Sequence, residues 1–376
     1  METTRVTDEY SAAAPRLYLA LELSAAQWVL LFCAGGQRPR QVRIAAGDLQ
    51  RLQREIALAK SKLQLPADAP VYSCYEAGRE AFWIHRALIA MGVHNSVIDP
   101  ASIEVSQRAK RVKTDRIDAE KLLKLLMRAC NGDCEGWRVV RVPSVQQEDE
   151  RHQHRERERL GKERTALRNR IGSLLVTQGI RLPRRRVLPA PDQLRCWDGQ
   201  PLPPHLAAEI ERMRQRCKLL EEQLRAIEKQ RLKALASEPG REQTRALMRL
   251  RAIGLQTSWI LNAELFSWRE IRNRGQLGAL SGLAPTPFAS GQLQREQGIS
   301  GAGNRRVRTS MIEIAWSWLR LQPGSALAQW FQRRFGSGGK RSRRIGIVAL
   351  ARKLLVALWR YLHDGVVPAG ATLKAA

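Results

Sequence analysis

Apolar residues form short alternating or periodic runs over the first hundred positions. Residues 16–33 contain two apolar, partly alternating runs that a polar turn at Ser24 separates, and Gly35 and Gly36 follow them, so we expect a hairpin here. The spacing then predicts a helix, a strand, a helix and a strand over 48–63, 71–78, 80–92 and 93–100. Strands that alternate with helices indicate an α/β layered domain.

Long, highly charged helices are predicted from about residue 144. The first covers 146–176 and is followed by a basic, proline-containing turn. The second begins after the prolines at 201–204, and its apolar residues repeat as in a heptad: Leu206, Ile210, Met213, Cys217, Leu220, Leu224 and Ile227. We expect an antiparallel helical hairpin or coiled coil, either as a bundle within one subunit or as an arm through which subunits associate.

The last third of the chain is predicted to be mostly helical, from near Gln243 to Leu362. Stretches rich in Gly and Ser at 281–303 and 335–344 interrupt it, and we expect loops there in which the backbone can approach phosphate. The predicted organisation is an α/β domain, a helical coiled-coil arm and a mainly α-helical C-terminal domain over 1–143, 144–240 and 241–376.

Charge points to a polyanionic partner. The 376 residues include 64 Lys and Arg against 36 Asp and Glu, a formal net charge of +28. Residues 1–107 are neutral, with eleven basic and eleven acidic side chains, so the excess lies entirely in the remainder. A basic solvated surface without a partner would not favour one part of the chain so strongly, and nucleic acid is the leading candidate.

Two dense basic clusters are candidates for contact with nucleic-acid backbone. They consist of Arg181, Arg184, Arg185 and Arg186 in the first, and Lys340, Arg341, Arg343 and Arg344 in the second. Runs of solvated charge are common in proteins, but this density in so basic a chain favours a polyanion.

The compartment is predicted to be the prokaryotic cytoplasm. Six scattered cysteines lack the spacing of a zinc site and are expected to be reduced thiols. The N-terminus has no basic and apolar signal sequence, and no apolar run is long enough to cross a membrane.

Four carboxylates are placed where an α/β nuclease domain would need them. Glu22 and Glu76 end predicted strands, and Asp115 and Asp118 share one face of a predicted helix. Oxygen ligands suit Mg²⁺, which would stabilise the attacking and leaving oxygens of phosphoryl transfer. Each carboxylate also has a simpler interpretation, since Glu76 could cap a helix and either aspartate could pair with a neighbouring cation.

Two long segments resemble a known family. CYEAGREAFWIHRALIAMG, followed by VIDPASIEVSQRAKRVKTDRIDAEKL, resembles the N-terminal domain of DEDD-type insertion-sequence transposases, the bridge-RNA-guided recombinases with a RuvC-like fold of RNase H type. LRAIGLQTSWILNAEL, QLGALSGLAP and GISGAGNRRVR are similar to the C-terminal transposase domain of that family. The resemblance covers nearly the whole chain, and the paired aspartates are its most specific element.

The resemblance assigns roles to individual positions. Glu76, Asp115 and Asp118 match metal-binding carboxylates of the family, and Glu22 stands where the family usually has Asp, which changes how that ligand reaches the metal. Ser290 matches the serine that attacks the DNA backbone. Ser281 and Ser300 also precede glycine, and only the resemblance ranks Ser290 first.

The function that the resemblance implies is Mg²⁺-dependent cleavage and rejoining of DNA by a transposase, through a covalent phosphoserine. Expected partners are donor and target DNA, a noncoding guide RNA and further copies of the chain in a dimer or tetramer, with no membrane. Two alternatives stay open: a RuvC-like structure-specific nuclease that uses water in place of serine, and a non-catalytic nucleic-acid-binding derivative. Formation of a covalent protein–DNA adduct discriminates between them.

Overall fold

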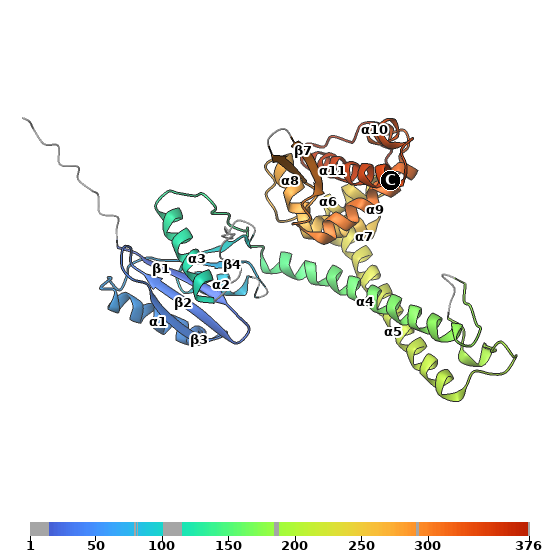
Figure 1. Cartoon of the computed structure of the whole chain (residues 1–376), viewed down its shortest axis with the longest axis horizontal. Helices are drawn as coiled ribbons and strands as arrows, with labels where there is room; N and C mark the ends of the chain where they lie inside the picture. Colours follow the sequence, from blue (N-terminus) through green and yellow to red (C-terminus); the bar gives the residue numbers. More distant parts are fainter. Residues whose placement is uncertain are drawn as a thin grey trace, which may run out of the picture. The chain divides into compact units, whose positions relative to one another are not determined.

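The chain divides into two compact units, residues 1–143 and 144–376. The computed structural model describes residues 15–78, 80, 82–100, 115–183, 188–290 and 293–374 (Figure 1). Each unit is described by itself below. The predicted three-part division of the chain stays a prediction.

The first unit is built on a five-stranded mixed sheet of order β3-β2-β1-β4-β5. Its strands are β1 Leu17–Leu23, β2 Gln27–Cys33, β3 Arg40–Ala45, β4 Val71–Glu76 and β5 His94–Ile98. The strand β1 pairs antiparallel with β2 and parallel with β4, and β5 continues the parallel part. The predicted hairpin and both later strands are confirmed, whereas β3 was not predicted.

Helices cover both faces of this sheet (Figure 1). Leu17, Leu19 and Leu21 of β1 pack with α1 (Leu49–Lys62) and α2 (Trp83–Ala90). Tyr18 and Ala20 face the other way and pack with α3 (Asp115–Cys130). Because successive residues of a strand point to opposite faces, a sheet that is buried on both sides needs the nearly continuous apolar run of β1.

The second unit begins with two long helices, α4 Val145–Val176 and α5 Pro204–Ser237. They pack side by side and antiparallel (Figure 1), since Arg157 pairs with Glu228 near one end and Arg170 with Glu209 near the other. The heptad positions of α5 are its buried ones, among them Ile210, Met213 and Cys217. Both predicted helices are confirmed, and a coiled coil stays a prediction.

The rest of the second unit packs mainly helices around one apolar core. The elements are α6 Glu242–Arg249, α7 Leu255–Leu261, the π-helical turn η4 Asn262–Phe266, α8 Arg274–Ser281, β6 Pro285–Ser290, β7 Leu293–Ile299, α9 Arg305–Leu321, α10 Ala326–Phe335 and α11 Lys340–Asp364. Buried residues from α6, α9 and α11, such as Leu247, Trp318 and Leu354, belong to the same cluster.

The prediction of loops is wrong in part for two segments. Residues 281–303 contain the antiparallel hairpin β6–β7, which a short connection joins at Ser290 and Leu293. Within 335–344 only Gly336–Gly339 connects two helices, and the remainder opens α11. Glycines at a helix junction and at a hairpin resemble a loop in sequence, because turn residues rather than apolar periodicity mark both.

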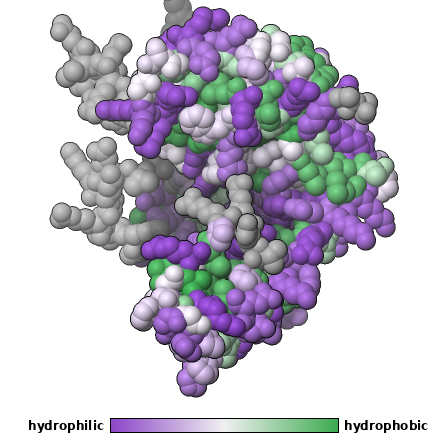
Figure 2. Space-filling view, turned by 90° about the vertical axis from the view of Figure 1, so that its right-hand side faces the viewer, coloured by the Kyte–Doolittle hydropathy of each residue, from purple (hydrophilic) through white to green (hydrophobic). Residues whose placement is uncertain are grey.

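Other features of the described residues concern the cysteines, the helices and the surface. The six cysteines are free thiols. Across the described part of the chain, no helix is both long and apolar enough to cross a membrane. The face drawn in Figure 2 is largely hydrophilic, with separate hydrophobic patches.

Candidate functional site

Two of the four predicted carboxylates lie side by side at one edge of the sheet. Glu22 follows Leu21 in β1 and Glu76 follows Tyr75 in β4, and Leu21 and Tyr75 are paired in the parallel register. Neighbouring strands are about 4.8 Å apart. Alternation places Glu22 on the same face as Ala20, and Glu76 on the same face as Cys74, which is the face that α3 covers.

The helix α3 runs antiparallel to these strands. Burial raises the pKa of Tyr18, at the start of β1, and the thiol of Cys130, the last residue of α3, adds to that rise. Farther along, the Cys74 thiol in β4 donates to the Leu122 carbonyl at 3.5 Å. The first turn of α3 therefore points toward the edge at which β1 and β4 end.

Distances along the elements bring Asp118 level with Glu76. Asp118 precedes Leu122 by four residues, about 6 Å of helix, and Glu76 follows Cys74 by two residues, about 7 Å of strand. The Asp118 carboxylate lies 3.2 Å from the Lys121 ammonium, which agrees with the simpler interpretation that an aspartate here pairs with a neighbouring cation. The backbone thus places the α3 aspartates near the edge of the sheet at which Glu22 and Glu76 lie.

The metal role of the carboxylates stays a prediction. Glu22, Glu76 and Glu80 line one cavity of about 320 Å³, so at least two of the predicted ligands share a space. Among the side chains that the structure describes, no group of three His, Cys, Asp or Glu is placed to hold one metal ion. The Asp115 side chain is outside that set.

Glu80 was missed by the sequence analysis. It precedes α2, and its Oε2 accepts a hydrogen bond from Trp83 Nε1 at 3.1 Å. A carboxylate in a turn belongs to no strand end, so the rule that identified Glu22 and Glu76 could not select it. It lines the same cavity as Glu22 and Glu76 but is not placed to hold one metal ion together with them.

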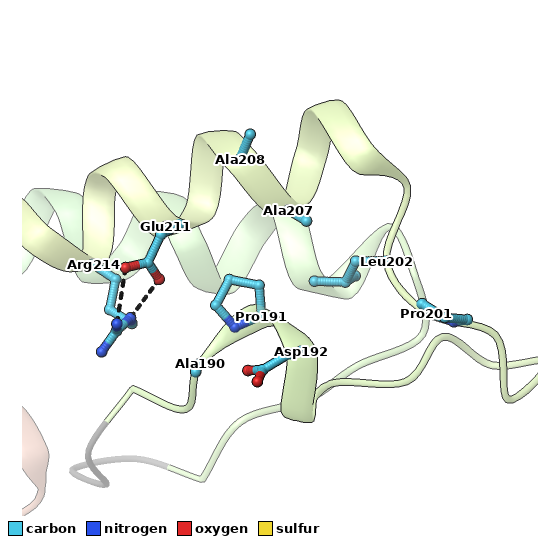
Figure 3. Close-up of a pocket in the computed structure, with 9 residues that line it drawn as sticks. All are labelled: Ala190, Pro191, Asp192, Pro201, Leu202, Ala207, Ala208, Glu211 and Arg214. Carbon is cyan, nitrogen blue, oxygen red and sulfur yellow. Dashed lines mark hydrogen bonds and ion pairs between the residues drawn. The ribbon is translucent and has the colours of Figure 1, made fainter.

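A larger cavity, of about 540 Å³, lies elsewhere, at the start of α5 (Figure 3). The short helix η3, Pro191–Gln193, forms one side of it, and the lining is mainly proline, alanine and leucine. Its Arg214 donates to both carboxylate oxygens of Glu211, at 2.7 and 2.8 Å. With these two charges paired to each other, the cavity holds no cluster of reactive groups and is not the candidate site.

Ser290, the predicted nucleophile, is the last residue of β6. Its side chain is not among those that the structure describes. Of the other two candidates, Ser281 is fully buried, and its hydroxyl donates to the Gly278 carbonyl at 3.0 Å. Ser300 is exposed just after β7. Burial therefore removes Ser281 from the candidates, and Ser290 and Ser300 remain.

The second basic cluster begins a helix. Lys340, Arg341, Arg343 and Arg344 are all exposed and occupy the first two turns of α11. Within the described residues, none of these four side chains has a hydrogen bond or an ion pair. In the first cluster Arg181 is exposed, and Arg184, Arg185 and Arg186 lie outside the described residues.

An exposed tryptophan near the first basic cluster was also missed. Trp197 lies in the connection between α4 and α5 and is 83% exposed. Its backbone N–H donates to the Gln178 carbonyl at 3.0 Å, and a tight turn follows, in which Cys196 N–H donates to the Gln200 carbonyl at 2.8 Å. The indole is therefore held outward by an ordered backbone, two residues after Arg195 and against Gln178, which precedes Arg181 by three residues.

Comparison with known proteins identifies the family. The family described as "Transposase IS116/IS110/IS902 family" matches residues 244–330. A Sinorhizobium fredii protein named as a transposase, y4rJ, is 40% identical over 95% of this chain and 94% of its own length. The transposase for insertion sequence element IS1328 of Yersinia enterocolitica is 25% identical over 79% of this chain and 85% of its own.

A third relative is the transposase for insertion sequence element IS1111A of Coxiella burnetii, which is 29% identical over 63% of this chain and 62% of its own length. The matched family segment contains both Ser290 and the hairpin that carries it. With 40% identity over nearly the full length of a relative, the chain belongs to the IS116/IS110/IS902 family of insertion-sequence transposases.

Proposed function

We propose that this transposase cleaves and rejoins DNA through a covalent phosphoserine formed on Ser290, assisted by Mg²⁺ at the carboxylate edge of the first unit. The observation that carries the proposal is the convergence of Glu22 and Glu76 on one cavity at the ends of parallel strands. The sheet order, a three-stranded meander continued by two parallel strands, supports the RuvC-like, RNase H-type fold that the sequence resemblance implies.

The residues would divide the work as follows. Glu22 and Glu76, with Asp115 and Asp118 from α3, would hold Mg²⁺, whose positive charge stabilises the developing charge on phosphate oxygens. The Ser290 hydroxyl would lose its proton and attack phosphorus. One backbone P–O bond would break as the new one forms, and the departing oxygen would take up a proton. The bond energy would stay in the phosphoserine ester, so rejoining would need no ATP.

Nucleic acid would be bound by the basic surfaces of the second unit. Cations in the first turn of α11 lie at the positive end of the helix dipole, where they lower the stability of the helix. Contact with phosphate would explain why basic residues occupy these positions. Trp197, which follows Arg195 and whose backbone bonds to Gln178, would stack on an unpaired base of a guide RNA or a DNA strand. We propose donor and target DNA and a noncoding guide RNA as the partners.

We further propose that the helical arm, formed by α4 and α5, joins copies of the chain into a dimer or tetramer as a coiled coil in the prokaryotic cytoplasm. The regular apolar seam of α5 is buried within the chain, where Ile210 and Met213 cluster with Ile171 of α4. The support for contact between copies is that Leu219 and Leu232 of α5 stay exposed on the arm. Sedimentation of the protein across a concentration series tests the oligomeric state.

Trapping of a covalent adduct tests the proposed chemistry. Purified protein, Mg²⁺, guide RNA and labelled DNA would be incubated and resolved under denaturing conditions, and the wild type is expected to retain label. Ser290→Ala and Glu76→Gln should both lose the adduct, while Ser300→Ala, the matched control just after β7, should keep it. Cleavage that persists without any adduct would indicate the nuclease alternative instead, and RNA binding without cleavage would indicate the non-catalytic one.

A further inference from the structure

A single carboxylate is buried where α4, the π-helical turn η4 and the start of α9 meet. Glu264 lies in η4 and is 1% exposed. Burial alone would raise the pKa of this carboxyl, but His154 and Arg155 beside it more than reverse the effect, so its pKa lies well below the usual range. Glu264 is therefore ionised at neutral pH, deep within the second unit.

Both oxygens of Glu264 have partners. On α4, His154 Nε2 lies 2.9 Å from Oε1, and Arg155 donates to Oε1 at 3.0 Å and to Oε2 at 3.2 Å. From the start of α9, Asn304 Nδ2 donates to Oε2 at 2.8 Å. A buried charge is tolerated when it is paired and hydrogen-bonded in this way. The carboxylate thus ties a helix of the arm to the segment that follows β7.

Asn304 also holds the backbone around it. Its Oδ1 accepts from the N–H groups of Arg306 and Val307 at 2.9 and 3.2 Å and caps α9. Its own N–H donates to the Leu280 carbonyl at 2.8 Å. The side-chain amide of Asn304 therefore binds Glu264 through its nitrogen and the first turn of α9 through its oxygen. A displacement of Glu264 would consequently disturb the start of α9.

The base of the β6–β7 hairpin depends on the same segment. Ser300 N–H donates to the Ala284 carbonyl at 2.8 Å, which closes the hairpin where it leaves α8. At Gly303 an added Cβ would come within 2.4 Å of Gly282 N, so the segment is packed directly against the end of α8. Residues 300–304 consequently have little room to shift.

Small changes at this base become larger at the tip. From Pro285 to Ser290 the strand is about 17 Å long at about 3.3 Å per residue. A tilt of about 5° at the base would move Ser290 by about 1.5 Å over that length. Misplacement of a reacting group by about 1 Å can cost about 100-fold in rate.

We infer that Glu264 is a positioning residue for the Ser290 reaction, which it serves by fixing Asn304 and the base of the β6–β7 hairpin against α4 of the arm. The inference rests on the proposed function, because it assumes that Ser290 is the nucleophile. Glu264 does not touch DNA in this assignment. Glu264 instead fixes the position of the β6–β7 hairpin.

A reciprocal exchange of the pair tests this assignment. Asn304→Asp would place two carboxylates against each other, whereas in the double variant Glu264→Gln with Asn304→Asp the Gln amide can donate to Asp, and Asp still caps α9. The Gln oxygen can still accept from Arg155 Nε, but the bond from Arg155 to Oε2 is lost, so the exchange restores the contact between positions 264 and 304 alone. Asn273→Asp is the matched control, because Asn273 also caps a helix, through a hydrogen bond from Gln276 N–H at 2.9 Å. Glu264 is not among the hydrogen-bond partners of Asn273.

The rate of adduct formation and DNA affinity would be measured in the full-length protein. We expect Asn304→Asp to slow adduct formation about 10-fold to 100-fold at unchanged DNA affinity. The double variant should recover part of that rate, although it is less stable than the wild type, and Asn273→Asp should match the wild type. Hydrogen exchange should rise in Asn304→Asp at residues 285–290 and 293–299, while exchange in α11 stays as in the wild type.

Three results would overturn the assignment. The first is a wild-type adduct together with an unchanged rate in Asn304→Asp, which would overturn the assignment alone. The second is a double variant that regains thermal stability without regaining rate. The third is a wild-type protein that forms no adduct, which would overturn the proposed function and this assignment with it.

Discussion

Replacement of the cations in the first turn of α11 should stabilise the protein and weaken its binding to nucleic acid at the same time. Lys340 and Arg341 are exposed in that turn, which contains no acidic residue, and the N-cap, Gly339, supplies no side-chain hydrogen bond. A cation near a helix N-terminus costs about 0.3–1 kcal/mol. The double variant Lys340→Gln with Arg341→Gln should therefore gain about 0.6–2 kcal/mol.

That gain corresponds to a rise of about 1–8 °C in Tm for a unit of this size at low ionic strength. Thermal unfolding of the full chain, followed by circular dichroism, would measure it. Salt dependence of binding to duplex DNA would measure the weaker binding. The slope of log K against log salt is negative, and each lost phosphate contact reduces its magnitude by about 0.9. Loss of two contacts should lower it by about 1.8.

Arg333→Gln provides the control. Arg333 is exposed in the last turn of α10, where a cation interacts favourably with the helix dipole, so its removal should lower the Tm slightly. The reasoning would be refuted if Lys340→Gln with Arg341→Gln lowered the Tm, or if the salt slope of binding did not change.

Three further predictions concern other parts of the chain. Because the pKa of Glu264 is depressed in the folded state, its contribution to stability is present above the unfolded pKa of about 4.3 and is lost as the pH falls below that value. Urea unfolding of the wild type across pH should show this acid limb, the fall in the free energy of unfolding at low pH. Glu264→Gln should remove the acid limb and cost about 3–5 kcal/mol of stability at pH 7. An unchanged acid limb in the variant would contradict the prediction. Trp197→Ala should leave the Tm unchanged, since the indole is 83% exposed, yet weaken binding to single-stranded RNA or DNA by about 1–3 kcal/mol in a fluorescence titration; equal affinity would exclude stacking. Glu22→Asp should retain Mg²⁺-dependent DNA cleavage and Glu76→Gln should lose it, and activity in Glu76→Gln would remove that residue from the metal site.

Apolar patterning predicted four of the five strands and missed β3, at one edge of the sheet. The run in β1 and β2 is nearly continuous because helices cover both sides of it. In β3 only Ile44 is buried, and its apolar alternation is limited to Val42 and Ile44 on either side of Arg43, which is too short to predict a strand. The hairpin β6–β7 escaped for a related reason, since Gly, Ser and Pro in a paired strand resemble a loop.

The candidate site was predictable where local rules determine it. Strand ends converge at one edge of a parallel sheet, and this sufficed for Glu22 and Glu76. Glu264 was not found, because its partner Arg155 lies 109 residues away in the sequence. A signal was nevertheless present: Glu264 is the one charged residue between Arg251 and Arg269, and a lone charge in an apolar stretch indicates a buried partner.

Identification of the residue that carries DNA in the covalent intermediate tests the central claim most directly. The adduct from wild-type protein, Mg²⁺, guide RNA and DNA would be digested with protease and nuclease, and the nucleotide-bearing peptide sequenced by mass spectrometry. We predict that the nucleotide is attached to Ser290 in the hairpin β6–β7. Attachment to Ser300 or to any other residue, or cleavage with no nucleotide-bearing peptide, would contradict the account.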